Sequence, residues 1–296
     1  MKMPAWMFAS VVLLPGFLSA QEDGFTQAAT LKDRRINESS GLALSHKHPG
    51  VFWTHNDSGG EPCLFAFDKT GVTVAKVRLP GAVNFDWEDI ASRKDADGVS
   101  WLYVADIGDN MRMRPSVQVY QIPEPDLPAD PAHEIESAEP RLWRGAYPDG
   151  RHDAESLLVH PLTGRIHIIT RSEDGRSGVY AFPEKLLEDE AMTLEKIAAL
   201  GFPLRARPGK RPRDAGMATA AAYSDDARRV IISTYSFFHE WTARPDEPLA
   251  DVLKRQAEVL TPPVLRQTEG VCYDADKLSL WFTSEQLPTP LYFMRR

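Results

Sequence analysis

The stretch DWEDI, residues 86–90, places three acids around a tryptophan and ends on an apolar residue. Similar stretches recur along the chain, each a polar cluster followed by small or aliphatic residues: ESSGL at 38–42, DAESL at 153–157, DAGM at 214–217 and QTEGV at 267–271. Their third positions, Ser40, Glu88, Glu155, Gly216 and Glu269, lie 48, 67, 61 and 53 residues apart. Self-similarity at such a period predicts one repeated supersecondary unit with loops of variable length.

The interior of each repeat reads as short strands. After the first stretch come VFWTHND, CLFAFD and VTVAKVRL, which are rich in β-branched and aromatic residues and are separated by glycine-containing turns. Such runs between turn residues are typical of β-strands. The later repeats follow the same plan, and TLEKIAAL, residues 193–200, is the expected last strand of the third repeat, with a partly helical segment at 184–200, EKLLEDEAMTLEKIAAL, as the alternative. Four strands for each repeat are therefore predicted.

The arrangement of these units predicts an all-β fold, a β-propeller with five four-stranded blades. The last repeat supplies only three strands before the chain ends, whereas a spare strand, within residues 25–36, precedes the first repeat. This N-terminal strand is expected to complete the last blade and close the ring, which removes exposed sheet edges. Six blades are the alternative count, and a β-sandwich with accidental repeats is the alternative fold.

The first twenty residues have a different character. Lys2 leads the apolar run MFASVVLLPGFL, which ends in Leu-Ser-Ala before polar residues. A charged start, a short apolar core and a small-residue end are typical of a secretory signal peptide. We therefore expect residues 1–20 to be a signal peptide, residues 21–296 to form a single propeller domain, and the protein to be secreted or periplasmic. A membrane anchor is the alternative for this run, and no later stretch is expected to span a membrane.

Charge and cysteine content exclude several classes of partner. The net charge is −8, and it becomes −9 once Lys2 is removed with the signal. An acidic protein gains nothing from counterion release, so nucleic acid and anionic membrane surfaces are not expected partners.

Cys63 and Cys272 lie in apolar stretches that favour buried free thiols, with a disulfide as the alternative. No sequence pattern of a zinc site is present.

The acids of the repeats predict a cation site. In a propeller the loop entering each innermost strand and the loop after each second strand open on the same face. Carboxylates gathered at one mouth repel each other, and a bound cation removes that conflict. Oxygen ligands favour Ca²⁺, with Mg²⁺ or Mn²⁺ as alternatives, although Asp and Asn also cap ordinary turns. The predicted metal ligands are Glu88, Glu155, Glu269, Asp89 and Asp106.

The same face is expected to bind a small anionic molecule. The stretch RARPGKRPRD, residues 205–214, adds basic side chains that suit a phosphate or carboxylate. His55 and His152 are candidate general bases, whereas His167 is expected to be packed within a strand. The chain is expected to act as a monomer. The predicted ligand-binding residues are Asn56, Asp57, Asp109, Asn110, Arg112, Arg171, Arg211 and Glu285.

Three stretches carry a family resemblance: THNDSGG at 54–60, DWEDIA at 86–91 and YVADIGDN at 103–110. They resemble a family of exported bacterial propeller proteins without a settled activity. The architecture is also similar to phytase-like and gluconolactonase-type calcium propellers. This resemblance implies that Glu88, Glu155 and Glu269 hold calcium, while Ala215–Gly216 departs from the pattern. We therefore expect a metal-dependent hydrolase or binder of a phosphoester or lactone, or alternatively a non-catalytic scaffold that binds an extracytoplasmic protein or glycan.

Overall fold

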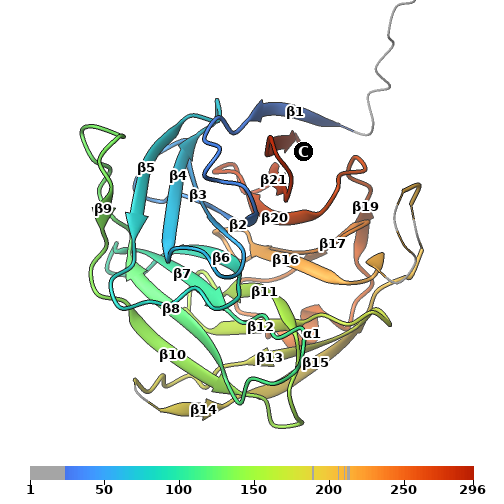
Figure 1. Ribbon diagram of the computed structural model, residues 1–296. Helices are drawn as coiled ribbons and strands as arrows, with labels where there is room; N and C mark the ends of the chain where they lie inside the picture. The colour runs from blue at the N-terminus through green and yellow to red at the C-terminus, as the bar shows by residue number, and fades with distance from the viewer. Residues whose placement is uncertain (1–23, 189, 206, 210, 212–213) are drawn as a thin grey trace, which may run out of the picture.

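Five mainly antiparallel sheets surround a common axis in the computed structural model, which confirms an all-β, five-bladed propeller (Figure 1). The structure describes residues 24–188, 190–205, 207–209, 211 and 214–296. The predicted signal peptide, residues 1–20, lies outside the described residues. So do Lys210 and Arg213 of the basic stretch. One short helix, α1 (Leu249–Val252), is present in the described part of the chain.

The blades are numbered here by the order of their innermost strands. Blade 1 consists of β2 (Ser39–Leu44), β3 (Val51–Asn56), β4 (Cys63–Asp68) and β5 (Thr73–Arg78). Blade 2 consists of β6 (Trp87–Lys94), β7 (Ser100–Asp106), β8 (Val117–Pro123) and β10 (Arg141–Ala146). Blade 3 consists of β11 (Ala154–Val159), β12 (Ile166–Thr170), β13 (Arg176–Ala181) and β15 (Glu195–Gly201).

The last two blades follow the same plan. Blade 4 consists of β16 (Ala218–Tyr223), β17 (Arg229–Thr234), β18 (Phe238–Thr242) and β19 (Glu258–Leu260). Blade 5 consists of β20 (Thr268–Tyr273), β21 (Leu280–Ser284), β22 (Pro290–Met294) and the N-terminal β1 (Phe25–Thr30). Strand β1 pairs antiparallel with β22, and the ring of Phe25 packs edge-on against Phe282 at 5.5 Å.

The innermost strands form the wall of the axial channel. Strand β2 contacts β6 and β20, β6 contacts β11, β11 contacts β16, and β16 contacts β20. At the far end of the channel their aliphatic side chains leave a cavity of only about 40 Å³, lined in part by Leu42, Ile90, Leu157, Ala221 and Cys272. The channel is therefore packed at that end, and polar groups gather at the other end.

Long loops between third and outermost strands protect the sheet edges. Strand β9 (Ile135–Glu136), from blade 2, pairs with β5 of blade 1. Strand β14 (Ala191–Thr193), from blade 3, pairs with β10 of blade 2, and α1 of blade 4 contacts β15 of blade 3. Each of these loops covers the edge of the preceding blade, which is how propellers avoid open edges. Two sheets therefore have five strands.

Three sequence predictions are decided by these elements. The strand predicted from TLEKIAAL, residues 193–200, is confirmed as β15, whereas the alternative of a partly helical segment at 184–200 is wrong, because β14 and β15 form there and pair with neighbouring strands. Cys63 and Cys272 are free and buried, as expected. No helix among the described residues is long and apolar enough to cross a membrane.

Every innermost strand begins with a register shift. The shifts fall between Trp87 and Asp89, between Ala154 and Ser156, and at corresponding places in blades 4 and 5. In blade 1 the shift comes slightly later, between Ser40 and Ala43. A β-bulge of this kind turns one side chain out of the strand alternation. In blade 4 the strand starts at Ala218, so Thr219 takes this place, and the sequence alignment on Gly216 was wrong. The bulge residues of blades 2 to 5 are Glu88, Glu155, Thr219 and Glu269, whereas Ser40 of blade 1 stays paired with His55 and precedes its bulge.

His167 gives the fold a testable pH dependence. It is buried in β12, as expected, and burial lowers its pKa to about 3, helped by the nearby charges of Arg165 and His160. An unfolded histidine binds a proton near pH 6.5, so the unfolded state takes up more protons between about pH 6.5 and 3. The neutral, buried His167 therefore lets the protein keep its full free energy of unfolding above pH 6.5, and this free energy should decrease as the pH falls below 6.5.

We expect His167 to cost about 2 kcal/mol of unfolding free energy between pH 7.5 and pH 5, since each pKa unit corresponds to about 1.4 kcal/mol. Urea unfolding at the two pH values should show a smaller loss in His167→Leu than in the wild type. His133→Leu, at a histidine with a 79% exposed side chain, is the control. An unchanged loss in His167→Leu would contradict this assignment.

Candidate functional site

The polar end of the channel, called the mouth here, is built from two sets of positions. The bulges at the start of the innermost strands supply Glu88, Glu155 and Glu269. The residues that follow the second strands supply Asp57, Arg171, Tyr235 and Glu285. Backbone hydrogen bonds from Asp57 to Glu38, from Arg171 to Asp153 and from Glu285 to Gln267 fasten these ends to the innermost strands.

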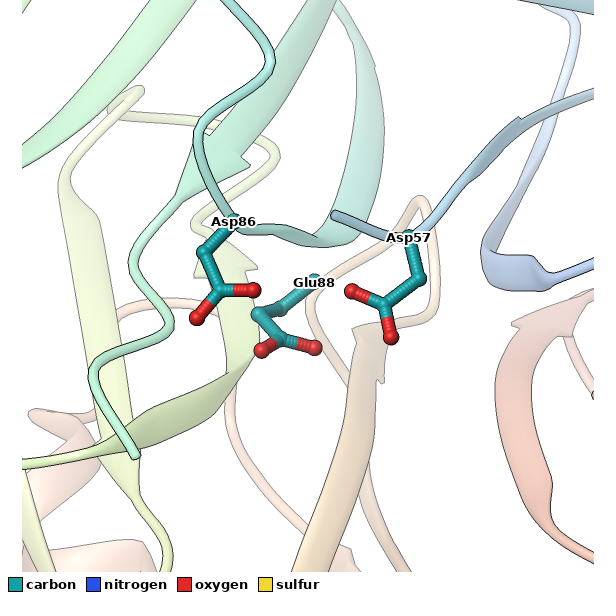
Figure 2. Close-up of side chains that lie close together, drawn as sticks. All are labelled: Asp57, Asp86 and Glu88. Carbon is teal, nitrogen blue, oxygen red and sulfur yellow. The ribbon is translucent and has the colours of Figure 1, made fainter. Parts of the chain in front are cut away.

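Three carboxylates meet on one side of the mouth. Asp57 comes from blade 1, whereas Asp86 and Glu88 flank Trp87 of blade 2, and one oxygen of each lies within 4.8 Å of the others. Figure 2 shows the three carboxyl groups directed toward a common space. Three carboxylate oxygens from two blades are the kind of ligand that a hard divalent cation takes.

Glu88 is the residue that makes this cluster unusual. Glu88 is only 4% exposed, and no described residue donates a hydrogen bond to its carboxylate, whose oxygens keep some contact with the solvent of the mouth. Burial, followed by the charge of Asp57, raises its pKa well above the usual range. Burial also raises the pKa of Asp86 to about 6 and raises that of Asp57. A largely buried carboxylate without a protein donor is costly unless water solvates it or a proton or a cation neutralises it.

Glu155 is used differently from Glu88. Its carboxylate forms an ion pair with Nη1 of Arg171, whose Nε donates to Asp153 at 2.8 Å and whose Nη2 donates to Asn110 at 2.8 Å. All three nitrogens of this guanidinium are thus engaged within the protein. Arg171 is a fixed positive charge of the mouth, and the structure does not leave it free to bind an anion.

A second group of acids lies on the side of blade 5. Glu269 accepts hydrogen bonds from the Tyr235 hydroxyl and from the Gln267 amide, each at 3.1 Å. The same amide donates to Glu285. Burial, followed for Glu285 by the charge of Glu269, raises the pKa of both acids, that of Glu285 to about 8. Glu269 therefore has donors that Glu88 lacks, and it lies outside the cluster of three carboxylates.

The two remaining predicted ligands also lie outside that cluster. Asp89 is fully buried, and its carboxylate accepts the backbone N–H groups of Ile90, Leu157 and Ala221 at 2.9, 2.8 and 3.2 Å. Asp106 pairs with Arg114 at 2.7 Å and accepts the N–H of Asp86 at 3.2 Å. Both acids hold protein groups in place, Asp89 across three blades and Asp106 beside the mouth.

Three of the predicted ligand-binding residues, Asn56, Asp109 and Asn110, stabilise the loops around the mouth. The Asn56 side chain accepts from Asn37 and Glu38 and donates to the Arg35 carbonyl. The Asp109 carboxylate accepts from Met113 and Arg114, and Asn110 accepts from Arg171. Arg112 is exposed in the loop between β7 and β8, and its backbone φ is 53°. Arg211 is exposed next to residues that the structure does not describe.

Neither candidate base lies free at the mouth. His55 is fully buried, contacts the ring of Trp87 at 5.6 Å, and has its pKa lowered to about 4 by burial. His152 contacts Asp149 at 2.9 Å and Tyr180 at 3.1 Å, in a cluster that also includes Lys196. The geometry therefore assigns no general base to either histidine.

Sequence reasoning missed the composition of the cluster. It placed Asp57 among the ligand-binding residues and gave Asp86 no role, although both accompany Glu88. The available signal was the pattern Asp-x-Glu in DWEDI, where the intervening Trp87 is buried and the two acids flank it. The contribution of Asp57 depends on the contact between blades, which no local pattern reveals.

Gly108 provides a specific test of the cluster. A Cβ atom at this position would overlap Oε1 of Glu88 and Oδ2 of Asp86. We expect Gly108→Ala to displace both carboxylates and to weaken divalent-cation binding at least about tenfold, because cation affinity depends on ligand placement. Calorimetric titration with calcium measures this. Gly201→Ala, where a Cβ meets nothing within 4 Å, is the control; equal calcium affinities in the two variants would contradict the expectation.

Comparisons with known proteins give no indication of function, so the geometry of the mouth is the basis for proposing one. A scan against protein-family models found no match, and a search of curated proteins found no significant match.

Proposed function

We propose that this protein is a propeller whose mouth binds a divalent cation, calcium or a similar ion, and through it a small anionic ester that it binds or hydrolyses. The observation that carries the proposal is Glu88, which is buried without a donor beside Asp57 and Asp86. Asp57, Asp86 and Glu88 would hold the cation. When bound, a cation of this kind polarises a phosphoryl or carbonyl oxygen.

The charges around the cluster support a cation more than an anion. The two guanidinium groups near it, Arg114 and Arg171, already pair with Asp106, Asp153 and Glu155. The acids of the mouth therefore keep an excess of negative charge among the described residues, and an anionic ligand would be repelled without a cation. The resemblance to phytase-like and gluconolactonase-type calcium propellers fits this proposal.

A second candidate is a non-catalytic propeller with a structural cation, which binds an extracytoplasmic protein or glycan. The arrangement of His55 and His152 favours it, because His55 is fully buried and His152 is held by Asp149 and Tyr180, away from the carboxylate cluster. A panel of phosphomonoesters and lactones, tested with calcium and with EDTA, separates the two candidates. Calcium-dependent turnover that is lost in Glu88→Gln supports the hydrolase, whereas calcium binding without any turnover supports the scaffold.

We also propose that β1 closes the ring and that the protein is exported. The pairing of β1 with β22 and the hydrogen bond from Leu31 to Thr289 support the closure. The charged and apolar sequence of residues 1–20 supports export. The anionic ligand would then be met outside the cytoplasm.

A further inference from the structure

An apolar lip lies beside the carboxylate cluster. We define the lip as Val83, Phe85, Met111 and Met113, whose residues are 61%, 61%, 78% and 63% exposed. Single exposed apolar side chains are normal on a protein surface, but several on two contacting loops mark a binding surface. The loops contact each other, because the guanidinium of Arg114 lies 4.8 Å from the centre of the Phe85 ring.

The loops that carry the lip are held in place by other groups. Asp109 accepts the N–H groups of Met113 and Arg114 at 2.7 and 2.8 Å, and its carbonyl accepts that of Arg112. In the loop that precedes β6, the Val83 carbonyl accepts the Trp87 indole N–H at 3.0 Å. None of these bonds uses a lip side chain. The apolar groups are thus presented to solvent on a fixed backbone, which lowers the entropy cost of binding.

The lip continues directly into the proposed cation site. Phe85 precedes Asp86, and the backbone of Gly108, in the same loop as Met111 and Met113, packs against Asp86 and Glu88. A single small molecule could therefore touch both the cation and the lip. The net charge of −8 disfavours the alternative of an anionic bilayer as the occupant.

We propose, building on the proposed function, that the ligand is an anionic amphiphile: its phosphate or carboxylate faces the cation, and its apolar group lies on Phe85, Met111 and Met113. Methionine side chains adapt to apolar groups of different shape, and an aromatic ring adds a flat contact. The lip therefore selects for an alkyl or aryl substituent on the ester.

Calorimetry with two alkyl phosphates tests this proposal. In the presence of calcium, n-hexyl phosphate should bind the wild type at least about tenfold more tightly than methyl phosphate, since each buried CH₂ contributes about 0.8 kcal/mol. The double variant Met111→Ser/Met113→Ser should lose this preference. It should still bind calcium, because no lip side chain belongs to the carboxylate cluster. Leu162→Ser, in the β11–β12 loop at the opposite face, is the matched control and should keep the preference.

The outcomes separate the two proposals. Equal affinities for the two phosphates, or no binding of either in protein that binds calcium, would overturn the lip proposal and leave the cation site. Absence of calcium binding would instead remove the proposed function on which the lip rests. Co-sedimentation with phosphatidylcholine vesicles that requires Met111 and Met113, without a chain-length preference in solution, would assign the lip to a bilayer and overturn the proposal.

Discussion

Asp89→Ala is expected to lower the free energy of unfolding by about 3–5 kcal/mol. The substitution removes one buried acceptor that serves three backbone N–H groups, those of Ile90, Leu157 and Ala221. Each buried donor left without a partner costs about 1–3 kcal/mol, and relief of the buried charge offsets part of the total. The carboxylate links the innermost strands of blades 2, 3 and 4, so its loss loosens the ring at its centre.

The backbone around Asp89 is closely packed and has little space to rearrange after the substitution. The neighbouring Gly41 has a φ of 75°, and a Cβ there would lie 2.9 Å from the Cα of Asp89. Urea unfolding should also rank Asp89→Asn between the wild type and the alanine variant, because its amide keeps one acceptor oxygen. Asp126→Ala, at a side chain 85% exposed, is the control. An alanine variant as stable as this control would refute the proposed role.

The second large effect is expected for Arg171→Ala. This guanidinium is buried and contacts Asp153, Glu155 and Asn110. Removing one partner of a buried ion pair costs about 3–5 kcal/mol, because the other charges stay buried without compensation. We expect this loss in calcium-free protein, together with a larger calcium-induced rise in melting temperature than in the wild type.

That calcium-linked rise distinguishes a charge at the cation site from a purely structural contact. The cation would neutralise carboxylates that Arg171 no longer screens, including Glu88, because burial raises the pKa of Glu88 and the charge of Arg171 offsets only part of that rise. Arg176→Ala removes an exposed arginine paired with Asp174 at 3.8 Å and is expected to change stability by less than about 0.5 kcal/mol. A calcium response of Arg171→Ala equal to that of the wild type would contradict the electrostatic reading.

The blade count was predictable because each blade repeats one local pattern. The polar stretch before each aliphatic strand marked the bulges of β6, β11 and β20. In blade 4 the pattern failed: Gly216 lies in the turn before the strand, and Thr219 takes the bulge position without any acid. The short strand β14 was missed since its partner, β10, belongs to another blade.

The site was predictable only in part. The mouth and Glu88 follow from the repeat, but the use of each acid depends on donors contributed by other blades. Glu155 forms an ion pair with Arg171, and Glu269 accepts a hydrogen bond from Tyr235. Asp89 accepts backbone N–H groups of two further strands. These partners are distant in sequence, so composition alone could not separate the acid that lacks a donor from those that have one.

Calcium titration of the calcium-free protein by calorimetry tests the central claim most directly. The account predicts one bound calcium for each chain, with an affinity at least about tenfold weaker in Glu88→Gln. Glu139→Gln, at an exposed glutamate, should bind like the wild type. No heat of binding in the wild type, or equal affinity in Glu88→Gln and the wild type, would contradict a cation site built on Asp57, Asp86 and Glu88.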